Sequence, residues 1–416
     1  MSPERTLDGP HGQAPRHPRA SVGIRQLGLA VVLAATLVPR AGAGQRIEVT
    51  GYALGVAVRS GSSALIRGGT ALLARARIMP KLTSGPVTVD VAYEHVLQRT
   101  PEGGGFAVTN PGGSVGGSGD WLGLDWSVMA SSRASWRQRF DRLSVAMDAG
   151  PVTVTVGRQA ISWATTLFLT PADPFAPFDP SDPFRAYRGG VDAVRVRAFP
   201  GPFSEVEAVV RGADTPNGKT LTALSRFQTS RGGWALGGWG GVLHDQAAGA
   251  LFATGAVGAT ALRTEAEVRK GLSGGATVRG AMGLDRRFSV SGRDLYVVVE
   301  AQYDGFGAAN ASELLATAAS KPYSRGEMQV LGRWSSAGQA SFQIHPLVSL
   351  DGLVLVDLED GSLLLAPGAT WSATASASVR VGVFTGAGRK ASATAGPRSE
   401  YGMVPTLGYI SLSWFF

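Results

Sequence analysis

The chain has 416 residues, with 57 glycines, no cysteine and a net charge of +8. The lack of cysteine excludes disulfides, thiolate metal sites and cysteine nucleophiles. No segment after residue 43 has the ~20 consecutive apolar residues of a transmembrane helix, which leaves a soluble β-protein or a closed β-barrel. The glycine content is typical of many strands joined by tight turns.

Residues 1–43 are predicted to be a cleaved signal peptide. Arginines precede an apolar run at residues 27–38, which is too short to span a bilayer as a helix. Ala41-Gly42-Ala43 then provides small residues at the spacing that signal peptidase requires, so we place cleavage after Ala43. Residues 44–416 are expected to form one exported domain.

Alternation of apolar and polar residues recurs along the rest of the chain and predicts antiparallel strands. The first of these are residues 45–58, 87–98, 143–149 and 152–159, and Gly150-Pro151 is a turn signal. Further strands are predicted at residues 191–199, 203–211, 221–229, 234–243, 250–257, 259–270, 276–288, 293–303, 327–334, 339–350, 353–358, 362–371 and 377–385. With a C-terminal strand and a weak strand near Trp121, the total is about 18, within a range of roughly 16–20.

Some features interrupt or border these strands. Residues 101–119 are a glycine-rich tract expected to form a surface loop, and residues 308–321 are expected to form a short helix or loop. Tryptophans near predicted strand ends favour aromatic girdles at membrane interfaces, with ordinary core positions as the alternative for a few of them. They are Trp126, Trp136, Trp163, Trp234, Trp239, Trp334, Trp371 and Trp414.

Residues 161–190 form the longest break in the pattern. Its prolines recur every three residues and exclude both helix and strand. They are Pro171, Pro174, Pro177, Pro180 and Pro183. An apolar, stiff and charged segment of this kind is expected to fold inward and narrow a pore. Its charged candidates for pore lining are Asp173, Asp179, Asp182, Arg185 and Arg188.

The three aspartates of this segment could also form a Ca²⁺ site, because hard cations take several carboxylate oxygens. However, no Asp-x-Asp-x-Asp-Gly loop is present, and Asp before Pro is common turn chemistry. We therefore expect neither a metal site nor a cofactor.

The hairpin that follows predicts a polar interior. Pairing across its turn would place Arg197 opposite Glu205 and Arg195 opposite Glu207. On a lipid-facing surface each arginine would cost about 2–4 kcal/mol near the midplane. The four side chains are therefore expected to face a wet lumen, where they line a pore or only stiffen the wall through ion pairs. Residues 263–269 repeat the same charged character.

The chain ends in a strand with two different faces. Ile410, Leu412, Trp414 and Phe416 fall on one face, and Ser411 and Ser413 fall on the other between Tyr409 and Phe415. The alternatives are the edge strand of a soluble sandwich and the closing strand of a barrel. An exposed edge with two consecutive phenylalanines would promote aggregation in a soluble protein, which favours the barrel.

This terminal strand resembles the closing strand of bacterial outer-membrane β-barrels. Residues 151–199 are similar to stretches of alginate-export-type and related porin-like barrels, through Gly157-Arg158-Gln159, Trp163, the Pro/Asp/Phe segment and Gly190-Val191-Asp192-Ala193. The resemblance implies a transmembrane antiparallel barrel of about 18 strands that passes a carbohydrate, often anionic, through a basic constriction. It implies Arg158 as a constriction residue beside Arg185 and Arg188, and an insertion signal at Tyr409, Ile410, Leu412, Trp414 and Phe416.

The chain departs from the family pattern in the acidic content of its long segment, which nearly cancels the arginines. The expected function is a passive outer-membrane pore for hydrophilic solutes, anionic or carbohydrate, including polysaccharide export. Expected partners are outer-membrane lipid and lipopolysaccharide, the barrel-assembly machinery and separate periplasmic polysaccharide-export components, with no nucleic acid.

A structural barrel within a secretion complex and a barrel enzyme remain alternatives. The sequence does not favour an enzyme. Gly112-Gly113-Ser114-Val115-Gly116 matches a nucleophile elbow only within a glycine tract, without the required strand and helix. No serine lies at a spacing from His95, His244 or His345 that would indicate a catalytic pair.

Overall fold

The computed structural model describes residues 44–63, 67–100, 119–175, 184, 187–270, 274–392 and 396–416. The predicted signal peptide, Asp179, Asp182 and Arg185 lie outside the described residues, as does nearly all of the glycine-rich tract. Within the described ranges, no helix has the length and apolar character to cross a membrane.

The described residues form nineteen strands in one sheet, and every strand pairing is antiparallel. The first ten strands are β1 (Gln45–Ser60), β2 (Gly69–Ser84), β3 (Val87–Arg99), β4 (Asp125–Ala130), β5 (Ala134–Ala149), β6 (Val152–Gln159), β7 (Val191–Gly201), β8 (Ser204–Thr215), β9 (Gly218–Arg231) and β10 (Trp234–Leu243). The others are β11 (Gln246–Val257), β12 (Thr260–Lys270), β13 (Ala276–Val290), β14 (Arg293–Asp304), β15 (Trp334–His345), β16 (Val348–Asp357), β17 (Leu363–Ser372), β18 (Ala377–Ala387) and β19 (Leu407–Phe415). Short helices lie in two connections: η1 (Ala311–Glu313), α2 (Leu314–Ala318), α3 (Lys321–Ser324) and η2 (Tyr401–Met403).

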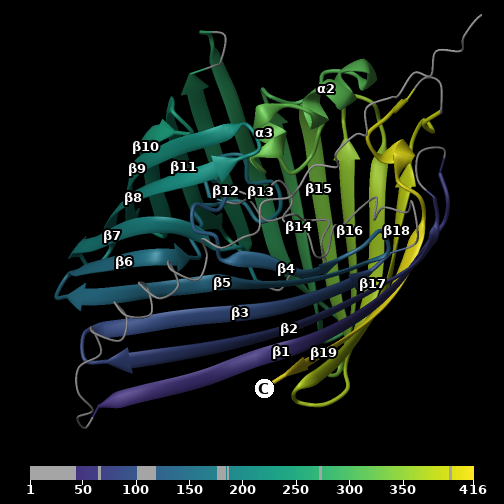
Figure 1. Ribbon diagram of the computed structural model, residues 1–416. Coiled ribbons are helices and arrows are strands. Elements are labelled where there is room, and N and C mark those ends of the chain that lie inside the picture. Colours follow the sequence, from purple (N-terminus) through teal and green to yellow (C-terminus); the bar gives the residue numbers. More distant parts are fainter. Residues whose placement is uncertain are drawn as a thin grey trace, which may run out of the picture. The chain divides into compact units, whose positions relative to one another are not determined.

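The sheet closes on itself, because β1 pairs with β2 along one edge and with β19 along the other. Figure 1 shows β1 and β19 side by side where the wall closes. β5 pairs with β3 along one edge, while its other edge pairs with β6 through residues 143–149 and with β4 through residues 135–139. β4 and β6 therefore share one position, so nineteen strands make a closed 18-strand barrel. The predicted fold and strand number are confirmed.

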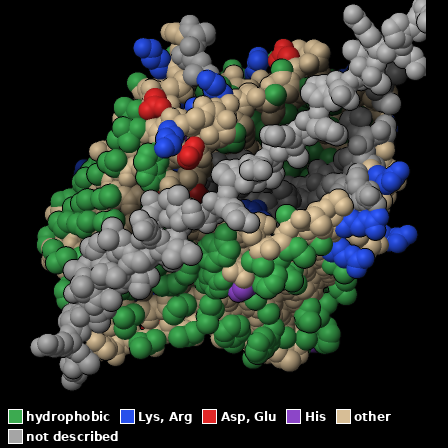
Figure 2. Space-filling view, in the orientation of Figure 1, with side chains coloured by type: hydrophobic (Ala, Val, Ile, Leu, Met, Phe, Trp, Pro, Cys, Tyr) green, Lys and Arg blue, Asp and Glu red, His purple; other side chains and the backbone are tan. Residues whose placement is uncertain are grey.

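Polar side chains face the interior of the barrel and apolar side chains face outward. Along β12, Glu265, Glu267 and Arg269 are buried, whereas Ala266 and Val268 between them are exposed. This follows from the two-residue period of a strand. Figure 2 shows hydrophobic side chains gathered over the outer faces of the strands. An apolar exterior around a charged interior is the pattern of a membrane barrel.

The two ends of the barrel differ in their connections. β9 and β10 meet at Gly232-Gly233, whose φ values of 60° and 81° suit the two-residue turn that matches the twist of paired strands. This end, the short-turn end, also carries the start of β1 and the end of β19. The opposite end, the long-loop end, carries the connections at residues 160–190, 305–333 and 388–406.

Some predicted strands differ from the observed ones. The prediction of a strand at residues 327–334 was wrong, since β15 begins only at Trp334. Met328 and Val330 of that stretch are buried instead, so their alternation came from a connection packed in the interior. The predicted strand at 339–350 contains the turn between β15 and β16. β2 was not predicted, although Ala74, Ala76 and Ile78 on its outer face alternate with Arg75 and Arg77, which are buried in the interior.

Candidate pore-lining site

The segment 160–190 lies inside the barrel in its described part, residues 160–175, 184 and 187–190. Trp163 and Phe175 pack edge-to-face with ring centroids 4.9 Å apart, in a buried cluster with Trp239 of β10. Phe184 packs edge-to-face on Tyr409 of β19, also at 4.9 Å. β10 and β19 are nine positions apart around the wall, so the segment reaches opposite parts of the barrel.

Two inward carboxylates hold this segment by its backbone. Glu265 of β12 accepts hydrogen bonds from the N–H groups of Thr165, Thr166 and Ala172, at 2.7, 3.3 and 3.0 Å. Glu300 of β14 accepts from those of Leu167, Phe168 and Leu169, at 2.6, 2.8 and 2.9 Å. These N–H groups belong to irregular backbone, where buried donors need an acceptor from elsewhere. Glu265 and Glu300 therefore fix the path of the segment.

Asp173 closes the segment on itself. Its carboxylate accepts from Ser162 Oγ at 3.1 Å and from the N–H groups of Trp163 and Phe175 at 3.2 and 3.1 Å. Arg188 makes an ion pair with it at 2.7 Å. Two of the predicted pore-lining residues are thus bound to each other.

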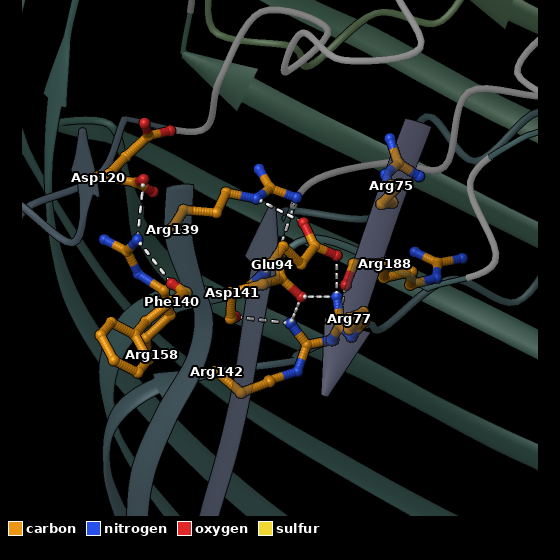
Figure 3. A network of polar contacts seen from close by, with 12 residues as sticks. Arg75, Arg77, Glu94, Asp120, Arg139, Phe140, Asp141, Arg142, Arg158 and Arg188 are labelled. Atoms are coloured by element: carbon orange, nitrogen blue, oxygen red, sulfur yellow. Dashed lines mark hydrogen bonds and ion pairs between the residues drawn. The ribbon is translucent and has the colours of Figure 1, made fainter. Parts of the chain in front are cut away.

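An ion network covers the inner wall where the segment returns to β7. Figure 3 shows three arginines converging on Glu94 of β3 and Asp141 of β5. Arg77 of β2 contacts Glu94 and lies 2.8 Å from Asp141, and Arg139 lies 2.8 Å from Glu94. Arg142 lies 2.7 Å from Asp141 and donates to the carbonyl of Arg188 at 2.6 Å. This wall network therefore ties the end of the segment to β2, β3 and β5.

Arg158 lies beside the network at the end of β6. It makes two parallel hydrogen bonds to Asp192 of β7, both 2.8 Å, and an ion pair with Asp120 at 3.1 Å. It also donates to the carbonyl of Leu122 at 2.8 Å. Asp192 in turn accepts the N–H groups of Trp121 and Leu122. Arg158 is only 2% exposed, so it organises the wall rather than presenting a free cation.

The register of the β7–β8 hairpin differs from the predicted one. Arg197 stands opposite Glu207, and Arg195 stands opposite Val209, because a bulge lies between Ala198 and Gly201. Arg195 still reaches Glu207 diagonally, with two hydrogen bonds of 2.7 and 3.0 Å. The predicted pair of Arg197 with Glu205 was wrong, whereas the pair of Arg195 with Glu207 is present.

The C-terminal strand has the two predicted faces. Ile410, Leu412, Trp414 and Phe416 are exposed on the outside, and Tyr409 is buried inside. Their role in insertion stays a prediction. Trp163 and Trp239 are buried in the interior, which is the core alternative for these tryptophans, whereas Trp334, Trp371 and Trp414 are exposed.

The histidines lie apart from one another. His95 accepts a hydrogen bond from Trp136 Nε1 at 3.2 Å, and His244 lies in the β10–β11 turn, 2.8 Å from Thr220 Oγ1. His345 ends β15. No cluster of three or more metal-ligating side chains occurs in the part of the chain that the structure describes. The absence of enzyme activity stays a prediction.

The connection 388–406 also packs against the interior. Glu400 is buried and accepts the N–H groups of Leu331 and Gly332, both at 2.9 Å. Burial raises the pKa of the Glu400 carboxyl to about 8, and the neighbouring carboxylate of Asp357 also raises it. Sequence reasoning missed this residue, as it missed Glu265 and Glu300 as anchors, because their partners lie far away in the chain.

We expect the contact between connections 388–406 and 305–333 to weaken as the pH rises towards about 8. A carboxyl whose pKa rises on folding stabilises the folded form fully below its ordinary pKa, and this contribution is lost as the pH passes its folded pKa. Hydrogen exchange of both connections, corrected for intrinsic rates, should therefore show less protection at pH 8.5 than at pH 5. Glu400→Gln should remove most of this difference, and equal pH dependence in both proteins would contradict the prediction.

The closed wall, the apolar exterior and the charged interior together define the architecture of an outer-membrane β-barrel. No protein-family model matches the chain, and the search of curated proteins finds no match either. Solved structures do match. A BenF-like porin from Pseudomonas fluorescens Pf-5 has 10% identity and a TM-score of 0.52, over 89% of this chain and 98% of that one.

Two further solved structures have the same fold. Acinetobacter baumannii OccAB1 has 8% identity and a TM-score of 0.51, over 89% of this chain and 96% of that one. Pseudomonas aeruginosa OccK2 (OpdF), in complex with glucuronate, has 10% identity and a TM-score of 0.51, over 89% of this chain and 98% of that one. At these identities the likeness concerns the fold. The shared fold supports the resemblance of the sequence to porin-like barrels. The resemblance to alginate-export-type barrels stays a prediction.

Proposed function

We propose that this chain is an outer-membrane pore that lets small hydrophilic solutes, anionic or carbohydrate, cross without energy input. The observation that carries the proposal is a closed wall that is apolar outside and charged inside, with a segment of its own chain within. Charged side chains at membrane depth are stable only where they face one another or water, as in the lumen of a barrel. The fold shared with a BenF-like porin supports the same function.

The proposal includes the orientation and the processing of the chain. Outer-membrane barrels have short periplasmic turns and longer extracellular loops. We therefore place the short-turn end in the periplasm and the long-loop end outside the cell, so that the segment 160–190 enters the lumen from the outside. Cleavage of residues 1–43 and recognition of the terminal strand by the assembly machinery belong to this proposal.

In three ion pairs of the inner wall the arginine is more exposed than the carboxylate, and this difference favours anions in the lumen. Arg139 is 23% exposed and Glu94 2%, Arg188 is 25% exposed and Asp173 0%, and Arg195 is 18% exposed and Glu207 1%. In each of these pairs the arginine side chain is thus more exposed than its carboxylate. The pair of Arg158 with Asp120 is the reverse, with Asp120 44% exposed. A solute therefore meets a mainly positive surface although the pairs are formally neutral.

Small carboxylates of sugar size are the solute class that we propose. Arginine recognises a carboxylate through two parallel hydrogen bonds, which Arg195 already makes with Glu207. The structure of OccK2 contains glucuronate, a sugar carboxylate, in a barrel of the same fold. Passage of whole polysaccharide chains, with separate periplasmic partners, stays a prediction from the sequence.

Single-channel recording in planar bilayers under a KCl gradient tests the proposal. We expect discrete conductance steps, a reversal potential that shows anion preference, and block by glucuronate. The double variant Arg195→Gln/Glu207→Gln keeps the net charge unchanged but removes an exposed guanidinium. It should therefore reduce the anion preference, because charges that line a pore set its selectivity, and the Gln oxygen at position 207 can still accept the hydrogen bond from Trp163 Nε1.

Arg99→Gln is the matched control, since Arg99 is exposed on the outer face of the wall and its loss should leave the reversal potential unchanged. Cation preference in the wild-type protein would contradict the proposed solute class. A folded barrel that shows no conductance would contradict the pore itself.

A further inference from the structure

A groove of about 590 Å³ lies on the outer face of the wall, where β19, β1, β2, β3 and β5 adjoin, and Met129 of β4 also lines it. Its floor consists of small residues, Gly55, Ala57 and Ala74. Leu72, Leu97 and Ile410 form its sides and are 47%, 45% and 51% exposed. Pockets that bind small molecules have volumes of roughly 300–1,000 Å³, so the groove is large enough for part of a ligand.

The strand register explains the groove. Gly55 stands opposite Ala74 on one side and Leu412 on the other, and Ala57 stands opposite Leu72 and Ile410. Small residues on the central strands are thus flanked by long side chains. A Cβ atom added to Gly55 would meet no atom within 4 Å, which shows that the space above it is open.

The groove has a positive charge at its long-loop end. Arg99 is the one charged side chain among the residues that line it. Arg59 lies two residues beyond Ala57 on the same outward face, ~6.6 Å further along the strand. Neither arginine makes an ion pair within the described ranges of the chain. Figure 2 shows basic side chains gathered at the right edge of the view, where Figure 1 places the end of β1 and the start of β19.

An aromatic group marks the membrane depth of the groove. Trp136 stands opposite Leu97, and its ring centroid lies 6.0 Å from that of His95. Trp126 and Tyr93 lie beside them on the outer face. Tryptophan and tyrosine concentrate at the membrane–water interface of membrane proteins. Arg59 and Arg99 therefore lie where lipid headgroups lie, and the apolar part of the groove extends along the wall below them.

We propose that this groove binds one phosphate-bearing lipid of the outer leaflet, lipid A, with an acyl chain over Gly55 and Ala74 and a phosphate on Arg59 and Arg99. An apolar groove that ends in two arginines without an ion pair among the described residues is complementary to an acyl chain that ends in an anionic headgroup; Arg59 donates only a 3.5 Å hydrogen bond to Thr70 Oγ1. Guanidinium groups bind phosphate through paired hydrogen bonds. The inference rests on the proposed outer-membrane location and orientation, but not on the proposed pore activity.

Native mass spectrometry of the full chain, expressed in the outer membrane of a Gram-negative host and purified in detergent, tests this site. Diphosphoryl lipid A is the probe, and phosphatidylcholine and dephosphorylated lipid A are the comparison lipids. We expect one retained copy of diphosphoryl lipid A and at least fivefold lower occupancy in Gly55→Leu, which fills the groove. Arg59→Gln/Arg99→Gln should lower it similarly and abolish the preference over dephosphorylated lipid A.

Gly352→Leu is the matched control, because Gly352 of β16 also has no atom within 4 Å of an added Cβ and lies outside the groove. It should bind as the wild-type protein does, and heat-modifiable gel mobility shows that each variant is folded. Equal occupancy in Gly55→Leu, or no preference for diphosphoryl lipid A, would overturn the proposal. A purified oligomer that dissociates in the Gly55→Leu variant without losing lipid would also overturn the proposal, because the groove would then hold a second copy of the chain. Membrane fractionation and single-channel conductance test the proposed location and function separately.

Discussion

Replacement of residues 162–188 by a short Gly-Ser linker should increase the single-channel conductance several-fold. The described part of this segment reaches from the cluster around Trp239 to Tyr409, nine strand positions away around the wall. The replacement leaves Arg158 and Asp192 in place, so the wall keeps the pair that joins β6 to β7. Removing the obstructing chain widens the path for ions, and single-channel recording measures the change.

The double variant Glu265→Gln/Glu300→Gln is the companion to this replacement. It keeps the segment but weakens the six backbone hydrogen bonds that hold it, because an amide offers one acceptor oxygen where a carboxylate offers two. We expect more current noise and a smaller increase in mean conductance. Unchanged conductance in the linker variant, with heat-modifiable mobility confirming a folded barrel, would show that the segment does not constrict the pore.

Arg158→Ala should lower the free energy of unfolding by about 3–5 kcal/mol, the usual cost of removing one partner of a buried ion pair. The guanidinium of Arg158 makes two 2.8 Å hydrogen bonds to Asp192 and is 2% exposed. Its loss leaves the buried carboxylate of Asp192 without its main counter-ion. Urea unfolding in lipid vesicles, followed by tryptophan fluorescence, measures the change.

Two variants separate a buried charge from a general packing defect. Arg158→Met/Asp192→Asn removes both charges while the Asn oxygen can still accept the N–H groups of Trp121 and Leu122, so most of the stability should return. Arg46→Ala breaks a surface pair, in which Arg46 is 79% and Glu48 46% exposed, and should cost less than about 1 kcal/mol. If Arg158→Ala costs no more than Arg46→Ala, the assigned role of Arg158 is wrong.

The class of fold followed from local sequence alone. A barrel wall between lipid and water forces a two-residue period on each strand, and that period is visible in single stretches such as residues 409–416. The strand number followed for the same reason, because the length of a strand is set by the thickness of the membrane.

The register between paired strands and the boundaries of some strands were predicted less well than the class of fold. The bulge between Ala198 and Gly201 moved Arg197 opposite Glu207, and no residue pattern marked it in advance. The stretch 327–331 alternates like a strand, but Met328 and Val330 are buried in a connection within the barrel. An alternating pattern indicates that one face of a segment is buried, but it does not identify the structure that buries this face.

Local residue patterns were sufficient to predict a barrel with a charged interior, because lipid, water and strand geometry act on neighbouring residues. Which charges pair and what holds the long segment became clear from the folded structure alone. Arg158 pairs with Asp192, 34 residues away, and Glu300 binds the N–H group of Leu167 across 133 residues. Contacts of this kind depend on closure of the barrel, which brings distant strands to one lumen, and local residue patterns carry no record of them.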